Sequence, residues 1–152
     1  MCSSDLVTGT EDLLMAAVLA RGETVLDNAA REPEVSDLAA LLTRMGARIQ
    51  GAGTSTIRIQ GVERLAGADH TIIPDRIEAG TYMIAAAITG GEVELVGARR
   101  DLVGAVAEVL GQAGVAIAET ARGLSVRRAN GLVAGTDVMT EPFPGFPTDL
   151  QA

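Results

Sequence analysis

Hydrophobic positions in the first part of the chain alternate between a helical spacing and short strand-like runs. Apolar residues three and four positions apart predict amphipathic helices at 11–20 and 34–45. Short runs rich in branched residues and bounded by turn residues predict strands at 23–27, 47–50 and 56–60. The first part of the chain is therefore expected to fold as helix, strand, helix, strand, strand.

The same order returns in the second part of the chain. An alanine-rich apolar pattern predicts a helix at 80–89, and a strand is expected at 92–96. A second helix is predicted at 101–112, and two closing strands are predicted at 115–118 and 124–127. The chain thus contains two copies of one five-element unit.

The two copies align as an internal repeat. Gly46 and Gly114 both follow a predicted helix, and Ile57 and Leu124 both lie in a closing strand; matching them gives a shift of 67 to 68 residues. Residues 61–75 are rich in Gly, Ala and Asp, which suits a connector and predicts a domain seam. Helices that alternate with strands predict an α/β or α+β fold.

Composition and charge narrow the classes of function. The 152 residues are 47% hydrophobic but include no Trp, one Tyr and two Phe, so the core consists of small and branched aliphatic side chains. Such a core suits close packing of helices on a sheet. The net charge of −8 argues against nucleic acid and against an anionic membrane surface as partners. An anionic small substrate stays open, because local arginines can outweigh the global charge.

The single cysteine and the single histidine limit the available chemistry. Cys2 has no second cysteine with which to form a disulfide or a thiolate zinc site, and we assign it no catalytic role. His70 is expected at the surface of the connector. No apolar run reaches the roughly 18–20 residues that span a bilayer, and the first residues show no signal pattern. We therefore expect a cytoplasmic protein with no metal and no cofactor.

Three segments precede predicted helices and allow two interpretations each. The backbone of residues 8–10 could receive a phosphate, but a cap formed by Thr10 is favoured. The carboxylates within Arg31–Glu34 favour a helix N-terminus electrostatically, and this structural role is favoured over a role in a site. Asp75 suits a cap for a helix that begins at Arg76, whose guanidinium could meet an anionic ligand.

The final segment is the most distinctive part of the chain. Residues 141–152 hold three of the five prolines and both phenylalanines, and they present Asp149 after a Pro-Thr step. A stiff backbone suits a preorganised site residue. Alternatively, Thr148 or Asp149 caps a helix that begins there, and the residues taken alone favour this cap.

Five stretches in order together resemble one family. They are Val7–Glu11, Asn28–Glu34, Gly51–Ile59, Ile73–Thr81 and Pro144–Ala152. Each stretch is weak or moderate evidence by itself, but their order over residues 7–152 is specific. They resemble the UDP-N-acetylglucosamine enolpyruvyl transferase family, whereas residues 1–6 do not match it.

This resemblance implies a fold of paired inside-out α/β domains, each built from threefold repeats of the unit described above. Residues 7–72 would form the last repeat of one domain, and residues 73–152 the first repeat of the next. The implied reaction transfers enolpyruvyl from phosphoenolpyruvate to the 3-hydroxyl of UDP-N-acetylglucosamine and releases phosphate. It is the first committed step of bacterial peptidoglycan synthesis, and hence serves the cell wall and cell division.

The resemblance also implies roles for individual residues. Asp149 would hold the sugar 3-hydroxyl and act as the base that takes its proton. Val7 and Thr8 would meet the substrate diphosphate at a helix start. Residues matching positions near the sugar and the interdomain cleft are Glu32, Glu34, Asp75 and Arg76.

The chain departs from the family pattern at Leu6, where a serine is usual, so the resemblance does not carry over the diphosphate contact that this serine would make. The loop with the family's reactive cysteine and the arginines for phosphoenolpyruvate do not occur in this chain, and Cys2 does not match that loop. We therefore expect a piece that needs the remainder of its own chain, is inactive alone and is poorly soluble. The alternatives are a shikimate 3-phosphate enolpyruvyl transferase, which lacks the 144–152 run, and a non-catalytic repeat scaffold.

Overall fold

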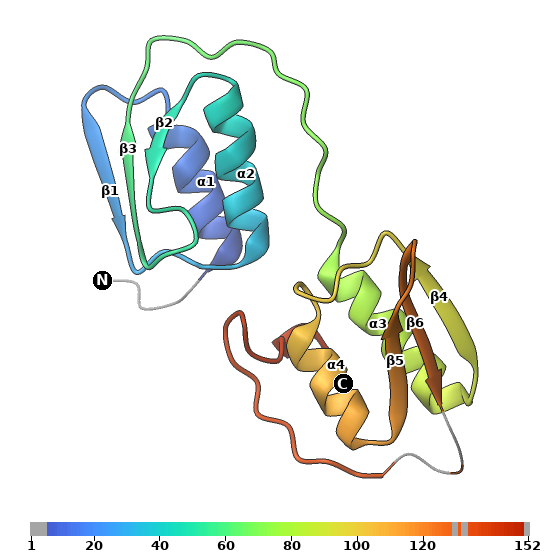
Figure 1. Cartoon of the computed structure of the whole chain (residues 1–152). Coiled ribbons are helices and arrows are strands. Elements are labelled where there is room, and N and C mark those ends of the chain that lie inside the picture. Colours follow the sequence, from blue (N-terminus) through green and yellow to red (C-terminus); the bar gives the residue numbers. More distant parts are fainter. Residues whose placement is uncertain (1–5, 129–130, 132–133, 151–152) are drawn as a thin grey trace. The chain divides into compact units, whose positions relative to one another are not determined.

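Each half of the chain folds into the same five elements (Figure 1). The structure, a computed structural model, describes residues 6–128, 131 and 134–150, so Cys2 lies outside the described residues. The first half contains α1 (Val7–Ala17), β1 (Glu23–Asp27), α2 (Pro33–Arg44), β2 (Arg48–Gln50) and β3 (Thr56–Gln60).

The second half repeats this order. It contains α3 (Arg76–Thr89), β4 (Glu92–Val96), α4 (Gly104–Gln112), β5 (Val115–Glu119), β6 (Gly123–Arg128) and a short 3₁₀ turn, η1 (Thr148–Leu150). Every predicted helix and strand is confirmed, and β1, β3 and β4 have the predicted bounds.

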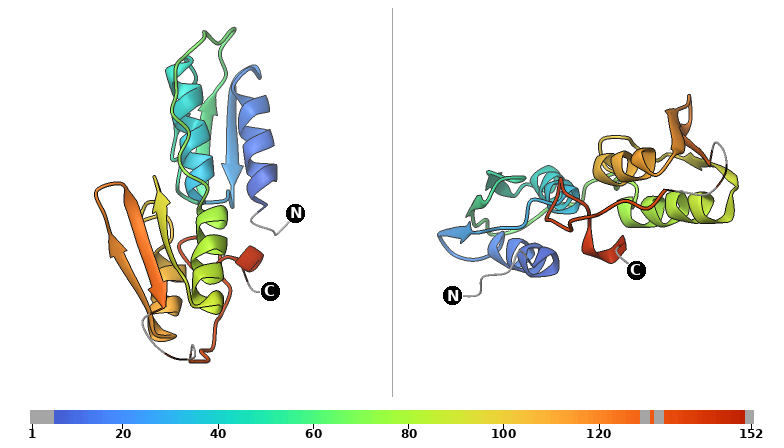
Figure 2. Two further views of the ribbon diagram at one scale, coloured as in Figure 1. Left: turned by 90° about the vertical axis from the view of Figure 1, so that its right-hand side faces the viewer. Right: turned by 90° about the horizontal axis from the view of Figure 1, so that it is seen from below.

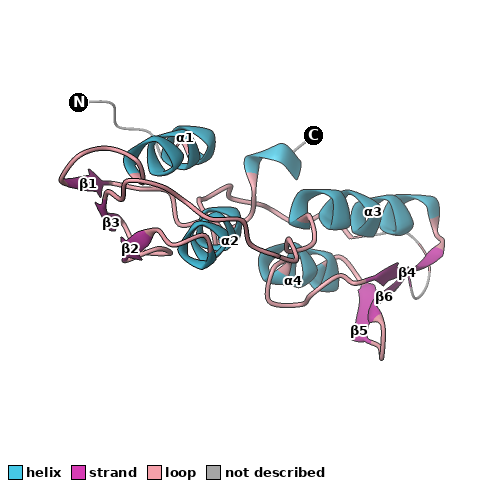
Figure 3. Ribbon diagram, turned by 90° about the horizontal axis from the view of Figure 1, so that it is seen from above, coloured by secondary structure: helices cyan, strands magenta, loops and turns pink. Residues whose placement is uncertain are grey.

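Each unit builds a three-stranded antiparallel sheet in which the last strand is central. The strand orders are β1-β3-β2 and β4-β6-β5. Val25 is paired with Arg58 in the first sheet, and Glu94 is paired with Ser125 in the second. The two helices of each unit lie on one face of its sheet, as Figure 3 shows. The other face is left uncovered by helices of the same unit.

Equivalent positions of the repeat fill the two cores. The central strands contribute Ile57 and Ile59 in the first unit and Leu124 and Val126 in the second, all at most 1% exposed. Helix residues complete each core; they include Leu14, Val35, Ala39 and Leu42 in one unit and Met83, Val106, Ala107 and Leu110 in the other. Complete burial of an aliphatic side chain of this size contributes about 1.5–3 kcal/mol. The alanines let the helices approach the sheet closely.

Helix ends differ from the predicted ends where local hydrogen bonds decide them. The helix predicted at 80–89 begins earlier, at Arg76, because Asp75 Oδ1 accepts hydrogen bonds from the backbone N–H groups of Ile77 (2.8 Å) and Glu78 (3.0 Å). This cap was expected from the sequence and is confirmed. The helix ends at Thr89, and Gly90 follows as its C-cap with a left-handed φ of 74°.

The connector, residues 61–75, contains no helix or strand, but it makes contacts with α2 of the first unit. His70 Nε2 lies 2.9 Å from Asp37 Oδ1, and the His70 side chain is only 8% exposed. Arg44 Nη1 donates a hydrogen bond to the carbonyl of Asp69 at 3.2 Å. The expected surface position of His70 is therefore wrong, because its imidazole is packed against α2.

The chain divides into two compact units, with the boundary between Ile73 and Pro74. The assignment of these units to the last and the first repeat of two domains stays a prediction. Among the described residues, no helix combines the length and the apolar character needed to cross a membrane.

Candidate functional site

The first helix begins without a side-chain cap. Leu6 occupies the N-cap position and makes no capping hydrogen bond, and no residue of the first turn is acidic. Val7 and the exposed Thr8 follow it as the first residues of α1. The first N–H groups of a helix have no partner within the helix and carry the positive end of its dipole. The start of α1 can therefore receive an anion.

Thr10 has a different role from the predicted cap. The helix begins earlier, at Val7, so Thr10 lies inside it and is only 7% exposed. Its Oγ1 accepts a hydrogen bond from the backbone N–H of Ala30 at 3.0 Å. The prediction that Thr10 caps the helix is wrong. Its hydroxyl instead ties α1 to the loop that leads to Glu32.

Carboxylates gather where α1 and α2 begin. Glu32 occupies the N-cap position of α2 but is 5% exposed, and none of the described residues donates a hydrogen bond to its Oε2. Glu34 lies in the first turn of α2. The pKa of Glu11 is raised, first by burial and then by the negative charges of Glu34, Asp12 and Glu32. A hydrogen-bond donor, such as a sugar hydroxyl, would be stabilised beside these groups.

In the second unit, the start of α3 meets the proline-rich segment. The guanidinium of Arg76 lies 5.6 Å from the centroid of the Phe143 ring, within the range of a cation–π interaction. A small cavity of about 50 Å³ lies beside this pair, and it is also lined by Val103 and Gly104 at the start of α4. The proline-rich segment therefore joins the starts of both helices of this unit.

Asp149 lies in η1 and is exposed. None of the described residues donates a hydrogen bond to its carboxylate, so both of its oxygens are available to a ligand. The segment around it is anchored, because Phe146 is 7% exposed in the core and its carbonyl accepts a hydrogen bond from the N–H of Glu141 at 3.0 Å. A longer helix capped by Thr148 or Asp149 would extend outside the described residues.

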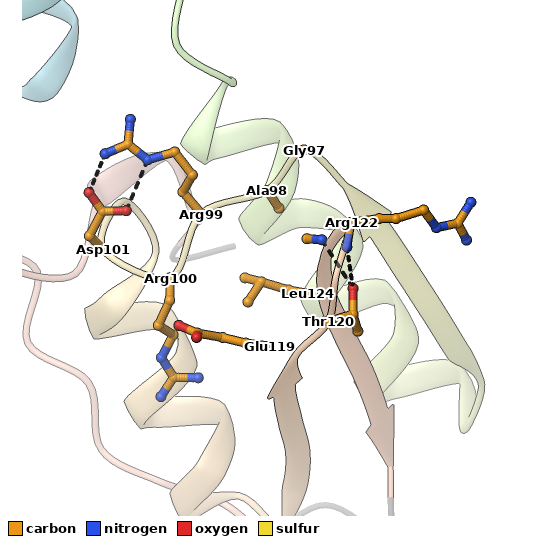
Figure 4. A pocket seen from close by; sticks show the side chains of 10 residues that line it. Gly97, Ala98, Arg99, Arg100, Asp101, Glu119, Thr120, Arg122 and Leu124 are labelled. Carbon is orange, nitrogen blue, oxygen red and sulfur yellow. Dashed lines mark hydrogen bonds and ion pairs between the residues drawn. The ribbon is translucent and has the colours of Figure 1, made fainter.

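A larger hollow, of about 650 Å³, lies elsewhere in the second unit (Figure 4). In Figure 4 the side chains of Arg100 and Glu119 reach towards the same space. Arg99 Nε donates to Asp101 Oδ1 at 3.1 Å, and this pair holds the pKa of Asp101 below its usual value. Charged side chains of both signs line this hollow, and none of the predicted site residues lines it.

The predicted site residues fall into two groups, one in each unit. Val7, Thr8, Glu32 and Glu34 lie where α1 and α2 begin, whereas Asp75, Arg76 and Asp149 lie around the start of α3 or on the turn packed against it. In both units, the group includes the N-terminal end of the first helix of the repeat, and in the first unit it also includes the start of the second helix, α2. The described residues include no group of three or more His, Cys, Asp or Glu side chains that could hold a metal ion.

Nothing in the hydrophobic pattern pointed to Phe143, Gly80 or Leu150 as parts of this region. Gly80 lies inside α3 and is buried, and the side chain of Leu150 packs over it. A glycine inside a helix costs about 0.5–1 kcal/mol relative to alanine, so it signals a close approach of another group. The predicted helix began at Gly80, and this start concealed that signal.

Comparison with known proteins finds a family model and several relatives that match almost the whole chain. A protein-family model described as EPSP synthase (3-phosphoshikimate 1-carboxyvinyltransferase) matches residues 2–152. The UDP-N-acetylglucosamine 1-carboxyvinyltransferase of Dinoroseobacter shibae is 66% identical over 146 residues, which are 96% of this chain and 35% of that protein. The protein of the same name from Rhodospirillum centenum is also 66% identical, over 96% of this chain and 34% of its own length.

A solved structure agrees in fold. The enolpyruvyl transferase NikO from Streptomyces tendae matches 95% of this chain and 35% of its own with a TM-score of 0.77. The sequence identity of 22% means that this likeness shows the fold alone. The chain spans 34–35% of the length of the two curated relatives named above.

Proposed function

Because the chain belongs to the EPSP synthase (3-phosphoshikimate 1-carboxyvinyltransferase) family, we propose that the whole protein transfers enolpyruvyl from phosphoenolpyruvate to the 3-hydroxyl of UDP-N-acetylglucosamine. Membership of the enolpyruvyl transferases was predicted from the five motifs and is confirmed. The α/β fold predicted for this family is confirmed as well. The proposal extends to the compartment predicted from the sequence, the cytoplasm, and to peptidoglycan synthesis as the process served.

One observation carries the choice of acceptor sugar. The relatives that are 61–66% identical over 96% of this chain are named UDP-N-acetylglucosamine 1-carboxyvinyltransferase. The family model, by contrast, is described by the enzyme that acts on a phosphorylated shikimate. Identity at this level over almost the whole chain favours the nucleotide sugar, and so does the run from Pro144 to Ala152.

In the proposed reaction, the sugar hydroxyl loses a proton as its oxygen bonds to the carbon that carries the phosphate, and the methylene carbon of phosphoenolpyruvate gains a proton. The methyl group so formed then loses a proton as the bond from that carbon to the phosphate oxygen breaks, which restores the double bond and releases phosphate. General base and general acid groups are therefore required. The carboxylate of Asp149 is exposed and accepts no hydrogen bond from the described residues, so it is free to accept one from the hydroxyl and then to take the proton. The anchoring of Phe146 nearby limits the motion of this turn.

The first unit would hold the charged part of the nucleotide sugar. The uncapped start of α1, at Val7 and Thr8, offers backbone N–H groups and the positive end of a helix dipole to a diphosphate. Glu32 and Glu34 lie beside it as acceptors for sugar hydroxyls. Leu6, which is 59% exposed, supplies no hydroxyl to the diphosphate. In the second unit, Arg76 adds a cationic group near the turn with Asp149.

The test replaces one carboxylate oxygen in the whole protein. Asp149→Asn keeps the size of the side chain but removes the base, so the rate of enolpyruvyl transfer is expected to fall by about 10²–10⁴-fold while the melting temperature stays unchanged. Asp137→Asn is the matched control, because Asp137 is another exposed aspartate before η1, and its activity is expected to equal that of the wild type. Unchanged turnover in Asp149→Asn would rule out this base.

Assays of the wild-type protein with two acceptors separate the proposal from its alternatives. A non-catalytic scaffold would show no transfer activity in the wild type either. A shikimate 3-phosphate enzyme would transfer enolpyruvyl to that acceptor and leave UDP-N-acetylglucosamine unchanged. Measuring phosphate release with each acceptor decides between the two substrates.

A further inference from the structure

The turn that carries Asp149 packs against one glycine of α3, Gly80. Leu150 is partly buried against the core of the second unit, and its side chain lies over Gly80. A Cβ added at Gly80 would collide with Leu150 Cδ1, and it would lie 3.7 Å from both Leu150 Cδ2 and Cγ. Figure 2 shows η1 beside α3, in agreement with the contacts between the two elements.

The glycine is not required by its backbone conformation. Gly80 lies within a regular helix and has no positive φ. Glycine is the poorest helix former after proline, so a helix of this kind would be more stable with alanine at that position. What Gly80 provides is the absence of a side chain where Leu150 approaches the helix.

The contact between Leu150 and Gly80 matters because the Asp149 side chain has no hydrogen bond, within the described residues, that fixes its own position. Its carboxylate accepts no hydrogen bond from any described residue. The turn itself is short: the N–H of Leu150 donates to the carbonyl of Pro147 at 3.2 Å, and Asp149 lies between these two residues. Asp149 therefore moves with Leu150 on one side and with the anchored Phe146 segment on the other.

We propose that Gly80 and Leu150 are positioning residues for Asp149, acting as a seat that sets where its carboxylate meets the attacking hydroxyl. This inference rests on the function proposed above. A displacement of about 1 Å in a reacting group lowers a rate by up to about 10²-fold, even when the fold is intact. The side chain of Leu150 thus does more than fill the core. Its contact with α3 fixes the distance between the adjacent Asp149 carboxylate and the helix.

The experiment uses the whole protein and compares two helix glycines. In Gly80→Ala the new methyl group pushes Leu150 and η1 away, so kcat is expected to fall about 10- to 100-fold, while the KM for phosphoenolpyruvate stays within about twofold. Gly111→Ala is the matched control, since Gly111 also lies inside a helix, α4, and a Cβ there would meet nothing within 4 Å. Its kcat is expected to equal that of the wild type.

A second variant gives a readout that a purely structural role would not move. Gly80→Ala/Leu150→Ala removes the atom that collides, and kcat is expected to recover part of the loss seen in Gly80→Ala. In an Asp149→Asn background, Gly80→Ala is expected to cause no further loss, because the group that it displaces no longer acts as a base.

The outcomes separate this inference from the proposed function. Normal turnover in Asp149→Asn overturns the proposed base, and the seat with it. If Asp149→Asn is inactive while Gly80→Ala behaves like Gly111→Ala, the base stands and the seat is wrong. An equal loss from Gly80→Ala with Asp149 and with Asn at that position also overturns the seat. Should Gly80→Ala fail to fold, Leu150→Ala alone tests the same contact, and an unchanged kcat there refutes it.

Discussion

The hydrogen bond between Thr10 and Ala30 is expected to be the main polar tie between the start of α1 and the loop before α2. Thr10→Val replaces the hydroxyl by a methyl group of similar size and keeps the branching at Cβ. The change therefore removes one acceptor and leaves the packing of α1 almost unaltered. It is a sharper perturbation than truncation to alanine, which would also leave a cavity.

The expected magnitude follows from the burial of both partners. Thr10 is 7% exposed and Ala30 is 1% exposed, so water does not replace the lost acceptor. A buried N–H group left without a partner costs about 1–3 kcal/mol. The free energy of unfolding is expected to fall by this amount. Thr10→Ser, which keeps an Oγ, is expected to lose less than half as much.

Urea unfolding followed by circular dichroism measures the loss, and amide hydrogen exchange locates it. The N–H of Ala30 is expected to exchange faster in Thr10→Val than in the wild type, while the amides of the second unit are unchanged. Thr8→Val is the control, because Thr8 is exposed in the same helical turn and its change is expected to be near zero. Equal losses for Thr8→Val and Thr10→Val would refute the reasoning, as would unchanged exchange at Ala30.

Two further predictions concern the first unit. Leu14→Ala is expected to lower the free energy of unfolding by about 2–5 kcal/mol, because Leu14 is 0% exposed. Leu13→Ala, at a position that is 57% exposed, is expected to lower it little, and chemical denaturation of the two variants measures the contrast. The raised pKa of Glu11 means that its ionised form is disfavoured in the fold, so Glu11→Gln is expected to stabilise the chain at pH 7 by less than about 1 kcal/mol. Thermal melts should show this gain fading as the pH falls through the raised pKa of Glu11 towards the ordinary value of 4.5, below which the wild-type carboxyl is protonated in the folded and the unfolded chain. Asp12→Asn is the control on the same helix, and a gain for Glu11→Gln that persists unchanged at low pH would contradict the assignment.

The elements of the fold could be predicted from the sequence because its hydrophobic period changes with each element. The alternation around Ile57 and Ile59 has the period of a strand with one buried face, and the structure confirms it. Helix starts were less predictable, since they depend on side-chain hydrogen bonds. Asp75 has the chemistry of a cap and was recognised, but Thr10 has the same chemistry and lies inside a helix.

Contacts between distant segments could not be predicted from periodicity. The position of His70 in a polar connector suggested the surface, yet its partner Asp37 lies on the helix before it, and only the folded chain brings the two together. The contact of Leu150 with Gly80 joins the ends of the second unit in the same way. The local sequence pattern indicates which face of a helix or strand is apolar, but it does not indicate which other segment of the chain packs against that face.

The repeat suggests how an acidic chain could bind anionic substrates. With a net charge of −8 and no lysine, the chain has no broad basic surface to attract a diphosphate. The start of α1 supplies positive potential from backbone N–H groups instead. Among the described residues, α1 has neither a side-chain cap nor an acidic residue in its first turn, whereas α3, the first helix of the other repeat, has both. At the equivalent place in the second unit, Asp75 already occupies the N–H groups of α3. The two copies of the repeat therefore differ where the proposal needs them to differ, one offering donors to an anion and the other offering a carboxylate, Asp149, to a hydroxyl.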